Sequence, residues 1–147
     1  MRSAKHIAQP ERSRTARQFD ALEAERKLVC EAYGVVHNSM AKATEQYCGF
    51  KSNTFNETMQ NPVYRSFPAC QPDVRREWDA VDLPYARVPC VQLAEWAGIA
   101  VPLHRAFAEI LGVLLGVDPW ACGPSLADMM YLDGSPGVVY KRVLGIH

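Results

Sequence analysis

The sequence lacks the glycine-rich motifs with which proteins bind nucleotide phosphates. Its nine glycines never fall into a G-x-G-x-x-G turn or a P-loop, so the phosphate cradle that a glycine turn forms at the start of a helix is missing. The sequence also has no signal peptide and no run of about 18 apolar residues, the length that a membrane span needs. These absences argue against a self-sufficient dinucleotide enzyme and against a membrane protein.

Neither the charge nor the cysteines point to nucleic acid or to a metal. Sixteen basic and sixteen acidic side chains cancel, whereas a nucleic-acid-binding protein usually has a clear excess of basic residues. The five cysteines are widely spaced, with no C-x-x-C pair and no histidine at zinc-ligand spacing. We therefore expect free thiols in a reducing cytoplasm and no metal.

Basic residues are concentrated at the N-terminus. Residues 1–18 hold five of the sixteen basic side chains, one acidic side chain and almost no large apolar ones. Such a segment buries too little surface to offset the entropy lost on ordering. We expect a disordered or extended basic tail over residues 1–18 and one structured domain over residues 19–147, a length typical of a single domain.

Helical periodicity runs through the rest of the chain. The first predicted helix begins at Asp20, which has capping-box spacing with Glu23. Its predicted buried stripe consists of Ala21, Ala24, Leu28, Ala32 and Val35. Further helices are predicted over 39–47, with Gly49 as the cap, from Thr54 onward, over 89–96 and over 102–115. Two more are predicted to begin at Ser125 and at Pro136. Residues 61–74 are predicted to form a loop.

The helix predicted to start at Pro102 has the strongest apolar pattern. Its expected buried face consists of Leu103, Phe107, Ile110, Leu111 and Leu114. His104 lies in the same helix without a carboxylate or cysteine at a telling spacing, so we interpret it as structural or exposed. No period-two strand stands beside these helices, and the predicted fold class is all-α, an irregular multi-helix domain.

One segment combines polar groups with two prolines. Pro84 and Pro89 each disfavour a helical conformation in the residue before them, which predicts an extended, stiff stretch that leads into a helix. This stretch would fix an acid, a phenol and a guanidinium, those of Asp82, Tyr85 and Arg87. The residues alone favour a structural Asp82 that caps a helix or forms a salt bridge, and leave a catalytic role open.

The same segment resembles a family signature. Asp82-Leu83-Pro84-Tyr85, followed by Val88-Pro89, is similar to the Asp-Val-Pro-Tyr-Gly-Leu-Val-Pro sequence in the helical domain of NAD(P)-dependent octopine/nopaline (opine) dehydrogenases. Glu25-Arg26 with Tyr33-Gly34 resembles the opening helix of that domain, and the stretches 93–102 and 111–118 resemble its later helices. The resemblance is collinear over roughly residues 20–147.

This resemblance implies a fold like the C-terminal domain of these enzymes, which is similar to that of 6-phosphogluconate dehydrogenase. The family condenses an amino acid with a 2-oxo acid and reduces the imine with NADH or NADPH. The cofactor, NAD or NADP, is held mainly by a Rossmann domain that this chain lacks. By resemblance, Asp82 is the catalytic partner of a histidine from that domain. An arginine is usual five residues before this acid, where the chain has Glu77, so Arg76, Arg75 and Tyr85 become the candidate substrate-binding residues.

The leading hypothesis is a cytoplasmic substrate-binding helical domain of an opine dehydrogenase-like oxidoreductase. It would bind amino acid and 2-oxo acid substrates, and would be inactive until a Rossmann domain completes it in cis or in trans. The alternative is a non-catalytic helical module, derived from such an enzyme, that serves dimerisation or ligand sensing. A homodimer is compatible with both interpretations.

Overall fold

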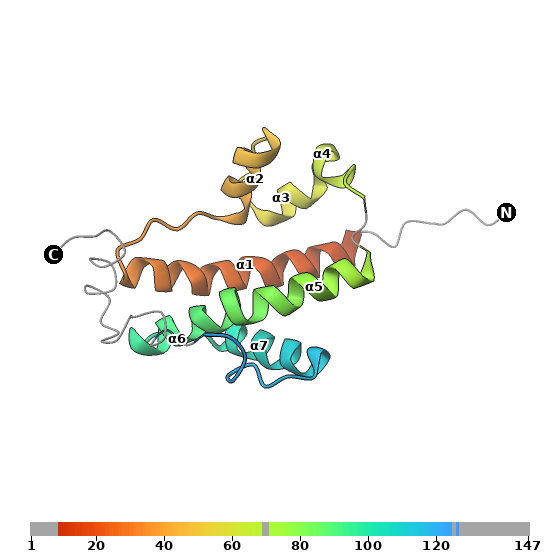
Figure 1. Ribbon diagram of the computed structural model, residues 1–147. Coiled ribbons are helices and arrows are strands. Elements are labelled where there is room, and N and C mark those ends of the chain that lie inside the picture. Colours follow the sequence, from red (N-terminus) through yellow and green to blue (C-terminus); the bar gives the residue numbers. More distant parts are fainter. Residues whose placement is uncertain (1–8, 69–70, 125, 127–147) are drawn as a thin grey trace. The chain divides into compact units, whose positions relative to one another are not determined.

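The computed structural model describes residues 9–68, 71–124 and 126 of the chain. Every regular element in these residues is helical (Figure 1), which confirms the predicted all-α fold class. The helices form two compact units. The first unit comprises residues up to 24 together with 38–68, and the second comprises 25–37 together with the chain from 69 onward. The long helix α1 (Gln9–Ala32) contributes to both units.

The first unit contains three short helices whose ends follow from local chemistry. Helix α2 (Met40–Cys48) begins after Ser39, whose hydroxyl accepts the Lys42 N–H at 3.2 Å, and ends at Gly49 in the left-handed conformation. Helix α3 (Phe55–Gln60) begins after Thr54, whose hydroxyl accepts the Glu57 N–H. Helix α4 (Pro62–Arg65) follows directly. The predicted caps of α2 and α3 are therefore confirmed.

A small core holds the first unit together. The rings of Phe19 and Phe55 stack with their centroids 4.4 Å apart. Thr58 is fully buried, and its hydroxyl donates to the carbonyl of Thr54 at 3.2 Å, so its burial leaves no polar group unsatisfied. Among the described residues, the rest of this core consists of Ala16, Leu22, Ala41 and Thr44.

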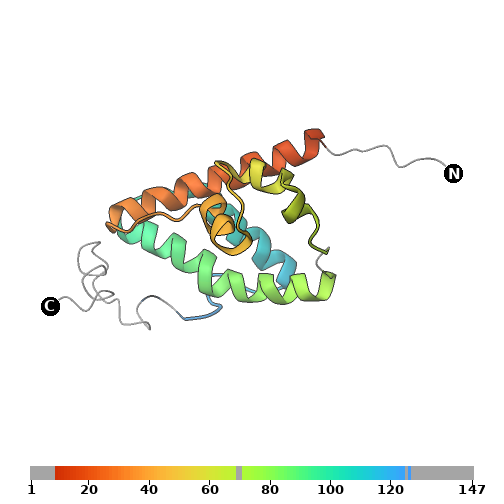
Figure 2. The same ribbon diagram turned by 90° about the horizontal axis from the view of Figure 1, so that it is seen from above.

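The second unit contains the longer C-terminal helices. Helix α5 (Pro72–Asp82), the π-helix η1 (Leu83–Arg87) and helix α6 (Val88–Trp96) follow one another without a break (Figures 1 and 2). Helix α7 (Pro102–Leu115) packs beside α6 and η1. Two buried clusters hold this unit together. Val29, Tyr33, Val91, Ala94 and Val101 join the end of α1 to the later helices, and Leu83, Val88 and Ala108 join η1, α6 and α7.

Several predicted helix boundaries are wrong. Helix α1 begins at Gln9 and not at Asp20, so residues 9–18 of the predicted tail are helical and Asp20 does not cap a helix. The predicted loop over 61–74 contains α4 and the start of α5, because Pro62 and Pro72 each occupy a first helical turn, where a missing N–H costs no hydrogen bond. The helices predicted from Ser125 and Pro136 lie outside the described residues.

The predicted buried faces of two helices have the right period but the wrong phase. On α1 the buried residues are Ala16, Leu22, Glu25 and Val29, whereas Leu28 is half exposed. On α7 they are His104, Ala108 and Gly112, and the expected face is turned outward: Leu103, Ile110 and Leu114 are exposed, and Phe107 and Leu111 are half-buried. Both helices are therefore rotated by about one residue from the position that apolar periodicity predicts.

In the part of the chain that the structure describes, no helix is both long and apolar enough to cross a membrane.

Candidate functional site

The segment around Asp82 is helical and not extended. The chain passes from α5 through the π turn of η1 into α6, and the Val88 N–H bonds to the carbonyl of Leu83, five residues earlier. A proline inside a helix lacks an N–H and crowds the preceding turn. A wider π turn absorbs such a residue without ending the helix, which explains why Pro84 produces a bulge instead of the predicted extended stretch.

The four predicted site residues lie along this helical stretch, and all four are exposed. Asp82 is the last residue of α5, Tyr85 lies in η1, and Arg75 and Arg76 lie in the middle of α5. Arg75 pairs weakly with Asp79 at 4.0 Å. Within the described residues, no hydrogen bond or ion pair joins Asp82 to the two arginines or to Tyr85. The structure therefore places the predicted residues on one element but not in mutual contact.

Buried neighbours hold the Asp82 segment in place. Leu83 is fully buried and Val88 nearly so, and both pack against Ala108 of α7. From the loop after α7, the backbone of Gly123 approaches Pro84 so closely that a Cβ at residue 123 would lie 2.4 Å from the Cβ of Pro84. With φ at 82°, Gly123 also adopts a conformation that favours glycine. The exposed acid and phenol thus flank two residues that are firmly packed.

Arg87 does not point freely into solvent. It is half-buried, and its guanidinium carbon lies 5.7 Å from the centre of the Phe107 ring, within the range of a cation–π contact. This contact ties η1 to α7 and keeps a positive charge close to the start of α7.

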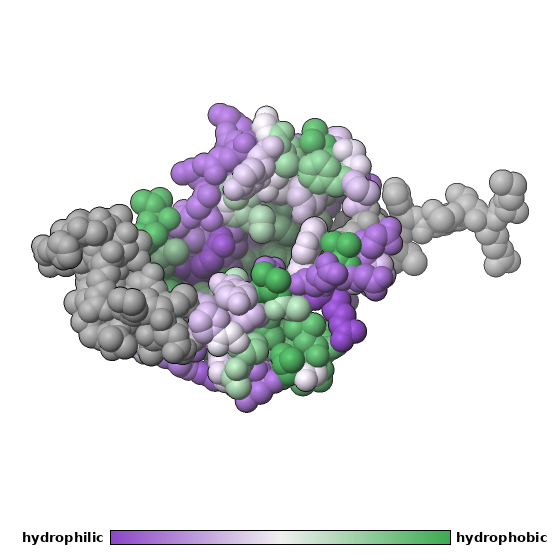
Figure 3. Space-filling model, viewed as in Figure 1, coloured by the Kyte–Doolittle hydropathy of each residue, from purple (hydrophilic) through white to green (hydrophobic). Residues whose placement is uncertain are grey.

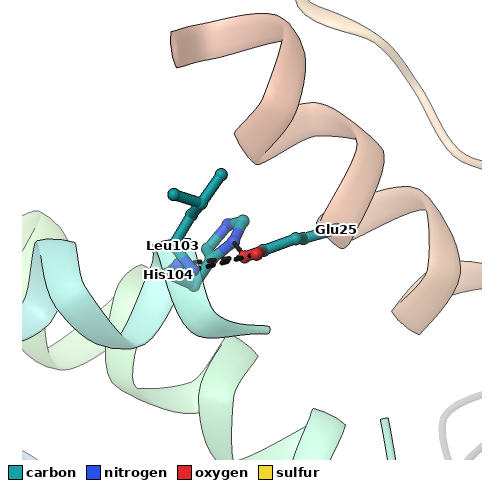
Figure 4. Close-up of polar contacts among 3 residues, drawn as sticks. All are labelled: Glu25, Leu103 and His104. Carbon is teal, nitrogen blue, oxygen red and sulfur yellow. Dashed lines mark hydrogen bonds and ion pairs between the residues drawn. The ribbon is translucent and has the colours of Figure 1, made fainter. Parts of the chain in front are cut away.

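A buried polar cluster that the sequence did not predict lies in the same unit. The carboxylate of Glu25 on α1 accepts the backbone N–H groups of Leu103 and His104, each at 2.9 Å, at the first turn of α7 (Figure 4). It also lies 2.9 Å from Nδ1 of the His104 ring. The interpretation of His104 as structural is therefore confirmed, and its carboxylate partner lies 79 residues earlier in the chain, where no local spacing indicates it.

The need for an acceptor at this point follows from the start of α7. The first N–H groups of a helix have no partner within the helix, and the residue that precedes α7, Val101, has no side chain that can cap them. Glu25 supplies the acceptor and adds a negative charge at the positive end of the helix dipole. The uncapped start of α7 is the signal in the sequence that points to such a distant acceptor.

The environment of the cluster perturbs both pKa values. Burial raises the pKa of Glu25, but the hydrogen bonds from Leu103 and His104 outweigh it, so the pKa lies below its ordinary value. Burial lowers the pKa of His104 and outweighs the hydrogen bond to Glu25, with Arg87 and Arg26 adding to the decrease. A charged Glu25 beside a neutral His104 follows, with Nδ1–H donating to the carboxylate. This cluster is closed to solvent and serves to join α1 to α7.

The comparison with protein families decides the identity of this helical domain. Residues 8–115 match the model of the NAD/NADP octopine/nopaline dehydrogenase alpha-helical domain. The chain belongs to this family. The match begins at residue 8, before the expected start at residue 20, and ends at residue 115, before the expected end at residue 147. It therefore includes the helical residues 9–18 and leaves out the residues after α7. No curated protein and no solved structure matches the chain.

Family membership implies NAD or NADP, and the described residues do not fit such a nucleotide by themselves. They contain no strand, and hence no strand–glycine turn–helix unit that could hold a pyrophosphate. The described part also has no group of three His, Cys, Asp or Glu side chains arranged to hold a metal ion. Its cysteines are free, and burial raises the pKa of the Cys90 thiol to about 11, which keeps that thiol protonated and unreactive.

Proposed function

We propose that this chain is the substrate-binding helical domain of an opine dehydrogenase-like oxidoreductase. The observation that carries the proposal is the family match over residues 8–115, which includes the Asp82-Leu83-Pro84-Tyr85 segment. In the proposed reaction the amino group of an amino acid condenses with the carbonyl carbon of a 2-oxo acid, and water leaves. Hydride from NADH or NADPH then reduces the imine to a secondary amine. We place this reaction in the cytoplasm, with neither a membrane nor a nucleic acid as partner.

Asp82 is the proposed catalytic carboxylate of this chain. It is exposed, and no described residue forms a hydrogen bond or an ion pair with it. An acid that caps a helix or forms a salt bridge has such a partner, whereas a carboxylate that receives an imidazole from another domain must be open. The imidazole would come from the Rossmann domain, and its hydrogen bond to Asp82 would fix its tautomer and stabilise its protonated form.

The exposed face of α5 supports a substrate-binding role. Arg75 precedes Asp82 by seven residues, which places both on nearly the same side of the helix, about 10 Å apart along its axis. Trp78 and Val81 are 60% and 57% exposed and form an apolar stripe beside them. We propose that Arg75 binds the carboxylate of the oxo acid with its planar fork, that Tyr85 lines the site one turn beyond Asp82, and that Arg76 points to another side of the helix.

The nucleotide is the proposed contribution of a Rossmann domain, in cis or in trans. We therefore expect no measurable NADH binding by this chain alone, as followed by titration calorimetry. Tight binding of NADH to the purified chain would contradict the proposed division of labour between the two domains.

The decisive experiment supplies the nucleotide-binding domain of a family enzyme, fused to this chain or added as a separate protein. NADH oxidation is then followed with pyruvate and a panel of amino acids. Asp82→Asn should lower kcat by a factor of about 100 to 10,000, the range that general acid–base catalysis contributes, while the unfolding midpoint stays unchanged. Asp73→Asn is the matched control, because Asp73 is also exposed and lies on the same helix. Equal turnover in parent and Asp82→Asn would refute the catalytic role of Asp82.

The second candidate is a non-catalytic helical module for dimerisation or ligand sensing. The observation that favours it is the large apolar surface that the second unit exposes on α5 and α7. This candidate predicts no NADH oxidation with any supplied Rossmann domain, either by the parent chain or by Asp82→Asn. The same set of assays therefore separates the two functions.

A further inference from the structure

The loop that follows α7 contacts the turn that carries the candidate site. Residues 118–124, which we call the 118–124 loop, lie beyond the residues that match the family model. The loop leaves α7 at its apolar end, the green area at the lower right of Figure 3, and turns back toward α6 (Figure 1). Near its end, Gly123 lies against Pro84, which is buried and stands in the sequence between the exposed Asp82 and Tyr85.

Two contacts between a glycine and a proline hold this loop. At the α7 end, a Cβ at Gly112 would lie 2.7 Å from Cδ of Pro119, and at the η1 end a Cβ at Gly123 would lie 2.4 Å from Cβ of Pro84. A backbone approaches another residue this closely only where no Cβ stands between them. Proline is a rigid ring that cannot turn aside. The 118–124 loop therefore bridges α7 and η1 and can move little relative to either.

Hydrogen bonds make the loop itself rigid. The carboxylate of Asp118 accepts the Trp120 N–H at 2.9 Å. The backbone carbonyl of Asp118 accepts the N–H groups of Ala121 and Cys122 at 3.2 and 3.1 Å. The indole N–H of Trp120 donates to Glu109 on α7 at 2.8 Å. A loop held at this many points is a fixed support for the turn that it contacts.

The π turn of η1 needs such a support. Pro84 has no N–H to donate, so the backbone at this point lacks one of the hydrogen bonds that hold a helix. Within the described residues, no hydrogen bond or ion pair holds the side chains of Asp82 and Tyr85. The backbone of Leu83 and Pro84 alone therefore sets the directions in which these two side chains leave the helix. The core fixes Leu83 from one side, and the 118–124 loop fixes Pro84.

We infer that Gly123 is a positioning residue, through which the 118–124 loop holds the carboxylate of Asp82 in the direction that catalysis requires. This inference rests on the proposed function and adds a residue to its machinery. Gly123 acts through Pro84 and touches no reacting group itself. A displacement of about 1 Å in a catalytic site can cost on the order of 100-fold in rate. Arg75 lies nine residues before Pro84, more than two helical turns away, so binding of the oxo-acid carboxylate should change far less.

The test is steady-state NADH oxidation by the chain fused to the nucleotide-binding domain of a family enzyme. Gly123→Ala should lower kcat by about 10- to 100-fold and change the KM for pyruvate by less than about twofold. Gly98→Ala is the matched control. Gly98 also has a positive φ and belongs to the same unit, but a Cβ there meets nothing within 4 Å. Its kcat should stay within about twofold of the parent value.

A second measurement separates positioning from loss of folded protein. In Asp82→Asn the positioned carboxylate is already gone, so adding Gly123→Ala should lower the remaining kcat by less than about threefold. A loss of folded protein would lower kcat by the same factor with and without Asp82. Asp118→Ala loosens the loop without adding an atom, because it removes the acceptor of the Trp120 N–H. It should lower kcat by roughly three- to tenfold, and only when Asp82 is present.

Amide chemical shifts of the chain alone report on the same geometry without turnover. In proton–nitrogen correlation spectra, Gly123→Ala should shift the signals of Asp82 and Tyr85, and Gly98→Ala should leave them in place. Equal kcat in the two glycine variants, equal losses with and without Asp82, or unmoved Asp82 and Tyr85 signals would each overturn the inference. A parent fusion that oxidises no NADH with any amino acid refutes the proposed function, and the catalytic role of Gly123 with it. An active parent with an equally active Gly123→Ala refutes the positioning role alone.

Discussion

Replacing Glu25 with alanine should destabilise the second unit by about 3–5 kcal/mol. The carboxylate accepts hydrogen bonds from the N–H groups of Leu103 and His104 and from the His104 ring, each at 2.9 Å. A buried donor that loses its acceptor costs about 1–3 kcal/mol. Three such donors give an additive range of about 3–9 kcal/mol. Water that enters the vacated space can accept some of these hydrogen bonds, so we expect a loss in the lower half of that range.

Glu25→Gln keeps one of the two acceptor oxygens and removes the charge. Its amide oxygen can still accept at the start of α7, but its NH2 group faces donors that the second carboxylate oxygen accepted from. A buried donor that loses its acceptor costs about 1–3 kcal/mol, so we expect an intermediate loss of about 2–3 kcal/mol. Glu31→Ala is the control on the same helix, since its exposed pair with Lys27 contributes less than about 0.5 kcal/mol.

Tryptophan fluorescence during urea unfolding is the appropriate assay. Trp78, Trp96 and Trp120 are the three tryptophans of the chain, and all belong to the second unit, so their emission reports on that unit alone. Linear extrapolation of each curve gives the free energy of unfolding. If Glu25→Ala unfolds at the same urea concentration as Glu31→Ala, the Glu25 cluster does not hold α7 in place and the reasoning fails.

Two further predictions use the same assay. The folded-state pKa of His104 lies below its ordinary value, so as the pH falls through about 6.5 the unfolded state binds a proton that the folded state does not. The free energy of unfolding should therefore fall between about pH 7 and pH 5.5. An equal fall in His104→Gln would contradict this cause. Gly123→Ala should cost about 2–4 kcal/mol, because the new Cβ meets Pro84 and the positive φ is unfavourable. Gly98→Ala, with a positive φ but open space, should cost only about 1–2 kcal/mol, and a Gly123→Ala loss no larger than this would show that the contact with Pro84 is not tight.

Helix ends whose signals are local could be predicted from the sequence. The hydroxyl of Ser39 and the left-handed Gly49 bound α2, and Pro102 and Gly116 bound α7. In each case a residue typical of a helix end lies within a few residues of that end. Pro10 lies in the first turn of α1, as Pro102 does in α7. Residues 9–18 have few apolar side chains, which is why apolar periodicity predicted the start of the first helix too late.

The path of the chain around Asp82 could not be predicted from local preferences. Each proline disfavours helix in the residue before it, and the stretch between Pro84 and Pro89 therefore favoured an extended conformation. The packing of Leu83 and Val88 against Ala108 holds this stretch in a helical path, and the π turn absorbs the missing N–H. The resemblance to the family signature identified the candidate site residues. The structure shows that they lie on one helical stretch.

The rotation of α7 shows most clearly why the core could not be predicted from apolar periodicity. His104 faces inward because Glu25, 79 residues earlier in the chain, accepts its hydrogen bonds, and no window of sequence contains both residues. A second feature requires the same rotation: a Cβ at Gly112 would lie 2.7 Å from the ring of Pro119, so only glycine fits at that point of the buried face. Since polar pairing and close packing specify one rotation independently, the outward position of Ile110 is dictated by the fold.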